Sequence, residues 1–176
     1  RPRPLFFDLD HTLWDFETNS RLALRLGHET IRLAGLGVAS VEAWIASYER
    51  ANDWCWAEFR AGRMDKATLR AERFRLAFKG LGVPAETQIC ERLGEHYIET
   101  SPMQTSLMEG TLEVLEVLKD RGHHMVILTN GFEEVQHIKV DNSGLSGFFS
   151  GVYTSDFLGV KKPNPKAFEF AAEAAG

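Results

Sequence analysis

The sequence of 176 residues is long enough for one domain, or for one domain that carries an insertion. Apolar residues make up 44% of the chain and charged residues 26%, which is the composition of an ordinary soluble globular protein. The formal net charge of −5, and the lack of any apolar run near the roughly 18 residues that span a bilayer, argue against nucleic acid polymers and membranes as partners.

The first predicted element is a short buried strand that ends in acidic residues. Leu5-Phe6-Phe7 is a continuous apolar run, which is typical of a strand covered on both faces in a parallel sheet. Asp8-Leu9-Asp10 follows this run at once. Two acids therefore stand at the carboxyl end of the first predicted strand.

A long helical stretch comes next. Between residues 14 and 108, apolar residues recur at helical spacing, as in Val41, Trp44, Ile45 and Tyr48, and glycine-rich breaks separate the helices. A crossover between parallel strands normally needs only one helix. We therefore interpret residues 14–108 as an all-α cap domain inserted directly after the first strand.

The rest of the sequence alternates between helices and strands. The predicted elements are, in order, a helix around residues 112–118, a strand at 125–128, a helix at 133–140, a weaker strand at 151–154 and a helix at 165–174. Such alternation predicts an α/β fold with a doubly wound parallel sheet. Residues 1–13 and 109–176 would form this core.

Polar side chains follow each predicted strand. Thr129-Asn130-Gly131 ends the second strand, and Lys161-Lys162-Pro163 lies a few residues beyond the third. Because ligands bind beyond the carboxyl ends of parallel strands, these groups should meet Asp8 and Asp10 at one edge of the sheet. Two such acids can share Mg²⁺ with phosphate oxygens, while a hydroxyl, backbone N–H groups and an ammonium suit the phosphate.

The same groups divide naturally into catalytic roles. A carboxylate nucleophile forms an acyl-phosphate and so splits one difficult hydrolysis into two easier steps. A second acid protonates the leaving alkoxide and later deprotonates the attacking water. The sequence therefore predicts chemistry on a phosphate ester.

Three segments resemble the motifs of the haloacid dehalogenase-like hydrolases. Phe7–Leu13 looks like their first motif, DxDxT, Ile127–Gly131 looks like their second, and Gly159–Phe168 looks like their third. The order and spacing match, and the helical insertion lies where subclass I members carry their cap. The stretch Leu13–Ser20 is similar, with less specificity, to the pyrimidine 5′-nucleotidase branch.

This resemblance implies a Mg²⁺-dependent phosphatase that hydrolyses a small phosphorylated metabolite, with a nucleoside 5′-monophosphate as the preferred substrate. It implies that Asp8 is the nucleophile and Asp10 the general acid and base. Both would bind the metal, Asp8 through its side chain and Asp10 through its main-chain carbonyl. The residues that it implies for phosphate binding are Thr129, Asn130, Gly131 and Lys162, the lysine that directly precedes proline.

Several alternatives remain open. The acid at position 10 favours phosphate transfer, because dehalogenases of this family lack an acid there and displacing a halide needs no proton. A phosphatase for phosphoglycolate or sugar phosphates, or a phosphomutase, would use the same motifs. A protein of another class, a non-catalytic phosphate-binding domain, would also keep them.

One expected motif is missing. The resemblance implies a fourth motif, an acidic pair or Gly-Asp followed by Asp, which comes after a fourth core strand and completes the magnesium ligands. The chain reaches Gly176 within the helix that should precede that strand. We therefore expect these residues to be part of a longer chain, with Asp156 as the alternative source of the missing ligand.

Cys55 and Cys90 match no metal or redox spacing. Each lies in a helix-like apolar stretch, so we expect two buried thiols and a reducing compartment. Acidic residues interrupt the first apolar stretch, and no signal segment is visible there. These features predict a cytoplasmic protein, while the oligomeric state cannot be read from the sequence.

Overall fold

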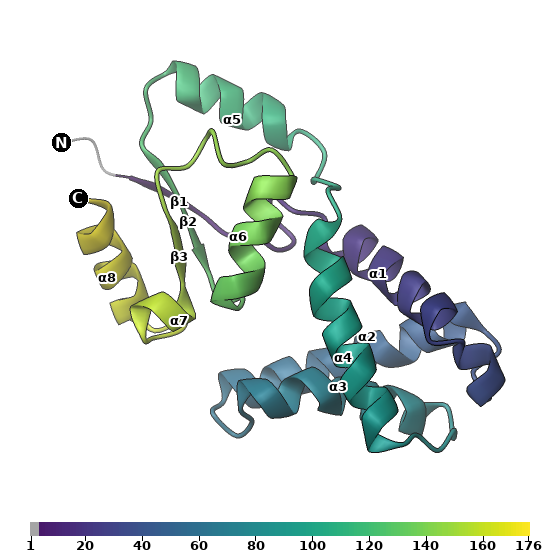
Figure 1. The fold of residues 1–176 in the computed structure, drawn as a ribbon. Coiled ribbons are helices and arrows are strands. Elements are labelled where there is room, and N and C mark those ends of the chain that lie inside the picture. The colour runs from purple at the N-terminus through teal and green to yellow at the C-terminus, as the bar shows by residue number, and fades with distance from the viewer. Residues whose placement is uncertain (1–3) are drawn as a thin grey trace. The chain divides into compact units, whose positions relative to one another are not determined.

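The computed structural model describes residues 4–176, so that Arg1–Arg3 of the predicted core lies outside the described residues. The chain divides into two compact units (Figure 1). Unit 1 runs up to Asn19 and then from Pro102 to Gly176, and unit 2 comprises Ser20–Ser101.

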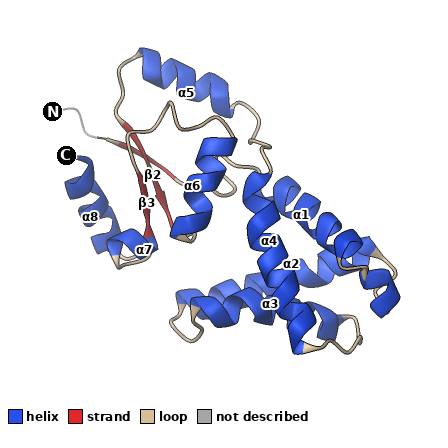
Figure 2. Cartoon of the chain, viewed as in Figure 1, coloured by secondary structure: helices blue, strands red, loops and turns tan. Residues whose placement is uncertain are grey.

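The described part of unit 1 contains a parallel sheet, drawn in red in Figure 2. Its strands are β1 (Leu5–Phe7), β2 (Met125–Thr129) and β3 (Val152–Thr154), in the order β1-β2-β3. Both pairings are parallel, with Phe7 opposite Ile127 and Thr129 opposite Thr154. The three strands therefore end at the same edge of the sheet.

Helices cover both faces of this sheet. They are α5 (Thr111–Asp120), α6 (Glu133–Asn142), α7 (Ser155–Leu158) and α8 (Pro165–Ala175). Figure 1 shows α8 on the other side of the strands from α5 and α6. All five residues of β2 are buried, as expected of a central strand covered on both faces. The predicted α/β fold with a parallel sheet is confirmed.

The core beneath α5 and α6 explains this packing. One face of the sheet contributes alternate residues, because successive side chains of a strand point to opposite faces. They meet apolar side chains from the two helices and from the loops beside them. The fully or nearly fully buried members of this cluster are Leu9, Leu13, Trp14, Leu115, Met125, Ile127, Val140 and Leu145.

Unit 2 is helical throughout its regular elements. It contains most of α1 (Phe16–Thr30), the 3₁₀-helix η1 (Leu33–Leu36), α2 (Val41–Arg60), α3 (Lys66–Gly80) and α4 (Thr87–Thr100). Side-chain caps fix two of the starts: Ser40 accepts a hydrogen bond from the N–H of Ala43, and Asp65 accepts one from that of Thr68. A further 3₁₀-helix, η2 (Ser101–Met103), stands at the boundary.

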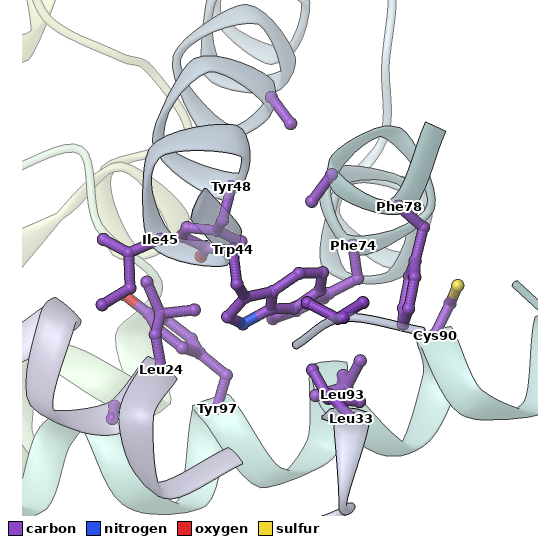
Figure 3. Packing of buried hydrophobic residues seen from close by; sticks show 14 residues of the cluster. Leu24, Leu33, Trp44, Ile45, Tyr48, Phe74, Phe78, Cys90, Leu93 and Tyr97 are labelled. Atoms are coloured by element: carbon purple, nitrogen blue, oxygen red, sulfur yellow. The ribbon is translucent and has the colours of Figure 1, made fainter. Parts of the chain in front are cut away.

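An aromatic cluster forms the core of unit 2 (Figure 3). The ring centroids of Trp44 and Phe78 lie 4.9 Å apart, and those of Tyr48 and Phe74 lie 5.0 Å apart. Contacts at these distances add to the stability that burial of the large side chains provides. Unit 2 thus has a hydrophobic core of its own.

The two cysteines belong to the buried part of unit 2, as expected. Cys55 is fully buried and Cys90 is 2% exposed. Burial raises the pKa of the Cys55 thiol to about 11, and burial also raises the pKa of Cys90. Both therefore behave as apolar core groups rather than as reactive thiolates.

The unit boundaries differ from the cap limits that the sequence suggested. Residues 14–19 and 102–108 group with unit 1 rather than with the cap. Trp14 is fully buried in the core of unit 1, and its indole N–H donates to the carbonyl of Gln104. Asn19 both donates to and accepts from the backbone of Ser106. These contacts tie the two connecting segments to the sheet domain.

Among the described helices, none combines the length and the apolar character that crossing a membrane requires.

Candidate active site

The carboxyl edge of the sheet brings predicted site residues together. Asp8 directly follows β1, Thr129 is the last residue of β2, and Lys162 lies in the loop between α7 and α8. The ammonium nitrogen Nζ of Lys162 lies 3.0 Å from Oδ1 of Asp8. A nucleophile candidate and a phosphate-binding candidate, far apart in sequence, are therefore in direct contact.

Asp8 has one carboxylate oxygen held and one available. Oδ1 accepts a hydrogen bond from the N–H of Leu9 at 2.9 Å and forms an ion pair with Nζ of Lys162. Within residues 4–176 its Oδ2 has no hydrogen-bond partner, and the side chain is 47% exposed. Leu9 is fully buried, so the acids on either side of it are anchored by a core residue.

Lys162 is held by its backbone as well as by its side chain. Its N–H donates to Oδ1 of Asn130 at 2.8 Å, and Nδ2 of Asn130 donates back to its carbonyl at 2.9 Å. Nζ also donates to the carbonyl of Leu128 at 2.7 Å. The peptide bond between Lys162 and Pro163 is cis. Asn130 thus joins the end of β2 to the lysine loop.

Thr129 presents a hydroxyl whose hydrogen-bonding direction is set. The side chain is buried, and Oγ1 accepts from the N–H of Gly131 at 3.1 Å and from Nε2 of Gln136 at 2.7 Å. A threonine hydroxyl has two acceptor lone pairs and one proton. Because both lone pairs are used, its proton remains to be donated, as a phosphate oxygen requires.

Asp10 is engaged by two residues that sequence reasoning missed. Its Oδ1 lies 2.7 Å from Nζ of Lys139, and its Oδ2 accepts from Nε2 of Gln136 at 2.9 Å. Both partners come from α6 and are buried. Positions 136 and 139 share one helical stripe with positions 132 and 140, but a stripe that mixes polar and apolar residues does not show from the sequence that its polar members are buried.

Asp156 has a structural contact. Its Oδ2 accepts a hydrogen bond from the N–H of Glu133 at 3.1 Å, at the start of α6. A carboxylate there satisfies a free N–H group and complements the helix dipole. Thr154 in turn donates to the carboxylate of Glu133. The structure thus accounts for Asp156 as a residue that joins the end of β3 to α6.

The oxygen ligands of the site suit Mg²⁺ better than a metal ion whose ligands are all protein side chains. Among residues 4–176, no group of three or more His, Cys, Asp and Glu side chains converges on one point. Asp8 offers a half-exposed carboxylate, whereas both oxygens of the Asp10 carboxylate are already engaged. Mg²⁺ is commonly held by one or two carboxylates, with waters and substrate phosphate as its other ligands.

Gly131 is required by the position of Gln136. A Cβ atom at Gly131 would lie 2.2 Å from Nε2 and 2.7 Å from Cγ of Gln136, far inside contact distance. The Gln136 side chain is fully buried, so it cannot swing into open solvent. The glycine at this position is therefore tied to the hydrogen bonds that Gln136 makes with Asp10 and Thr129.

The variant Gly131→Ala should consequently disturb both α6 and the site. Overpacking of this kind costs about 1–3 kcal/mol of unfolding free energy. Chemical denaturation would measure this loss, with Gly147→Ala as the control, because a Cβ there meets nothing within 4 Å. Equal stability of the two variants would show that Gln136 can move without penalty.

Comparison with known proteins places these residues in a family context. Residues 4–176 match the family model described as haloacid dehalogenase-like hydrolase. The HAD-hydrolase YfnB of Bacillus subtilis is 28% identical over 98% of this chain and 70% of its own length. Its crystal structure, bound to magnesium, covers 98% of this chain and 74% of that one with a TM-score of 0.84.

Two further relatives are pyrimidine 5′-nucleotidases. PynA of Streptococcus pneumoniae is 28% identical over 94% of this chain, and YjjG of Escherichia coli is 27% identical over 98%. The chain spans 66% of the length of PynA and 71% of that of YjjG. It thus corresponds to about two thirds of the length of these enzymes.

Dehalogenases share the fold. The structure of L-2-haloacid dehalogenase from Xanthobacter autotrophicus covers 98% of this chain and 64% of that one, with a TM-score of 0.68 at 19% identity. Haloacetate dehalogenase H-2 of Moraxella is 36% identical, but over 48% of this chain and 36% of its own length. The common architecture therefore serves two kinds of hydrolysis.

Proposed function

The chain belongs to the haloacid dehalogenase-like hydrolase family, and from this premise we propose that it hydrolyses small phosphate monoesters through a phosphorylated Asp8. The observation that carries the proposal is the 3.0 Å contact between Oδ1 of Asp8 and Nζ of Lys162. This contact puts a half-exposed carboxylate beside a cation at the carboxyl edge of the sheet. Thr129 ends a strand at the same edge, and its hydroxyl proton is available for donation because both of its lone pairs accept hydrogen bonds. A nucleophile and ligands for a phosphoryl group are thereby combined.

In the first half-reaction, an oxygen of Asp8 attacks phosphorus and the bond from phosphorus to the leaving oxygen breaks. Asp10, protonated for this step, gives its proton to that oxygen, so that an alcohol leaves. Lys162 and the Thr129 hydroxyl offset the charge on the transferring phosphoryl group. The product of this step is phosphorylated Asp8.

In the second half-reaction, Asp10 takes a proton from water as the water attacks phosphorus. The bond to Asp8 then breaks, and inorganic phosphate leaves with the carboxylate restored. Magnesium, held by the Asp8 carboxylate and the Asp10 main-chain carbonyl, would neutralise phosphate charge when bound. The acid at position 10 favours this chemistry over dehalogenation, since the release of a halide needs no general acid.

We further propose pyrimidine nucleoside 5′-monophosphates as the substrates and the cytoplasm as the location. The relatives PynA and YjjG support the first proposal, and the two buried free thiols support the second. Other relatives are named glyceraldehyde 3-phosphate phosphatase and phosphoglycolate phosphatase. Sugar phosphates and phosphoglycolate are therefore the rival substrates.

The test uses the complete natural reading frame that contains these residues. Phosphate release from an aryl phosphate should require Mg²⁺, disappear with EDTA and return when Mg²⁺ is added in excess. A panel of pyrimidine and purine nucleotides, sugar phosphates and phosphoglycolate should then give the highest kcat/KM with a pyrimidine nucleotide. Halide release from haloacetate without phosphate release would overturn the proposal.

A further inference from the structure

Lys139 is a buried cation on the helix that follows Thr129. Its side chain is 5% exposed, and Nζ lies 4.2 Å from the ring centroid of Trp14 and 5.5 Å from that of Phe16. Taking an ammonium out of water is costly unless an anion compensates for the loss. The anion is Asp10, whose Oδ1 is 2.7 Å away. A charge of this kind is unusual in a helix interior and calls for a role.

Gln136 is the second residue of α6 that holds the Asp10 side chain in place. It is fully buried, and its Nε2 donates to Oδ2 of Asp10 at 2.9 Å and to Oγ1 of Thr129 at 2.7 Å. A carboxyl group only accepts hydrogen bonds when it is ionised and keeps acceptor lone pairs when one oxygen carries the catalytic proton, so the amide nitrogen can face Asp10 in both states. Each oxygen of Asp10 therefore has its own donor, and one amide group links Asp10 to Thr129.

We propose that Lys139 and Gln136 are positioning residues for hydrolysis, acting through Asp10 and Thr129. Lys139 and the aromatic rings beside it hold the Asp10 carboxylate in one orientation for both proton transfers. Gln136 fixes the spacing between this carboxylate and the hydroxyl that donates to phosphate. This inference rests on the proposed function, and neither residue exchanges a proton with the substrate.

The first test compares Lys139→Met with Asp10→Asn in the complete natural reading frame. Lys139→Met should lower kcat by about 10²-fold, the lower end of what general acid–base catalysis contributes, with little change in KM. Lys139→Arg, which keeps the charge, should recover most of this loss. The matched control is Lys119→Met, which removes an exposed lysine that also lies over an aromatic ring, that of Phe148.

Lys119→Met should stay within about twofold of the native rate, as expected of a surface change. Circular dichroism and thermal melting of every variant separate loss of fold from loss of positioning. If the kcat of Lys139→Met is no lower than that of Lys119→Met while the native protein is active, the inference fails and the proposed function stands. An inactive native protein would overturn both.

A series of aryl phosphates gives a readout that a merely structural role would not move. If Lys139 acts through Asp10, the decrease in kcat caused by Lys139→Met should be greatest for substrates whose leaving groups have a high pKa. Asp10→Asn should show the same dependence. The double variant Asp10→Asn/Lys139→Met should then be no slower than Asp10→Asn alone. Equal losses for all leaving groups, or multiplied losses in the double variant, would overturn the proposal.

Gln136→Met tests the second link. The thioether keeps the length of the side chain but cannot donate to Asp10 or Thr129. We expect kcat to fall and KM to rise by about tenfold, which corresponds to about 1.4 kcal/mol and lies within the range for the loss of one hydrogen bond. An unchanged KM would remove Gln136 from the orientation of Thr129.

Discussion

Asp8→Asn is expected to reduce kcat by about 10⁴-fold or more, because removing a member of a covalent catalytic group costs on the order of 10⁴–10⁶-fold, with the nucleophile at the upper end. An amide cannot form the acyl-phosphate that the proposed pathway requires. The fold should remain, since the Asp8 side chain is 47% exposed and an ion pair of this exposure stabilises little. The loss should therefore lie in chemistry alone.

Phosphate release and circular dichroism would be measured on the same preparations of Asp8→Asn. Asp141→Asn is the matched control, because Asp141 is an exposed acid of unit 1 that contacts Ser146 away from the sheet edge. Its rate should stay within about twofold of the native rate. Near-native turnover by a folded Asp8→Asn protein would remove Asp8 from the nucleophile role.

Lys162→Ala is expected to lower kcat/KM by about 10²–10³-fold, the effect of removing one group that stabilises transition-state charge. Nζ of Lys162 lies 3.0 Å from Oδ1 of Asp8 and 2.7 Å from the carbonyl oxygen of Leu128, so these two contacts fix the position of the ammonium group. The backbone hydrogen bonds to Asn130 do not depend on the lysine side chain, so alanine should leave the loop in place.

Lys161→Ala is the natural comparison for this variant, because it removes the neighbouring positive charge. We expect the loss in Lys161→Ala to be much smaller than the loss in Lys162→Ala. The kcat/KM values of the two single variants on one aryl phosphate decide the matter. A greater loss in Lys161→Ala would place the functional lysine one residue earlier in the chain.

Much of unit 1 could be predicted from local patterns. The apolar runs at residues 5–7 and 125–128 become β1 and β2. β2 is fully buried, as expected of a strand covered on both faces, whereas the three residues of β1 are only partly buried, because β1 lies at the edge of the described sheet. The helices expected at residues 133–140 and 165–174 also form, with ends that differ by at most two residues. By contrast, the four-residue α7 escaped prediction, since a single turn has no periodicity to detect.

The candidate site divides in the same way. Asp8 and Asp10 stood out because they follow the first strand, and Thr129 because it ends the second, whereas the family resemblance selected Lys162, which lies beyond α7. The catalytic roles of these residues stay predictions. Gln136 and Lys139 did not stand out, because a buried polar residue is recognisable only from the partner that satisfies it. That partner, Asp10, lies 126 residues from Gln136 and 129 from Lys139 along the chain.

Periodicity and residue type thus suffice for the α/β class, the helical insertion and the groups at the strand ends, because each depends on neighbours in sequence. Tertiary packing decides the rest. It assigns Trp14 and Asn19 to unit 1, and it pairs α6 with Asp10 across the sheet edge. A buried lysine or glutamine is tolerated only where a carboxylate or hydroxyl replaces the hydrogen bonds that it made with water. When that partner is distant in sequence, no local pattern indicates it.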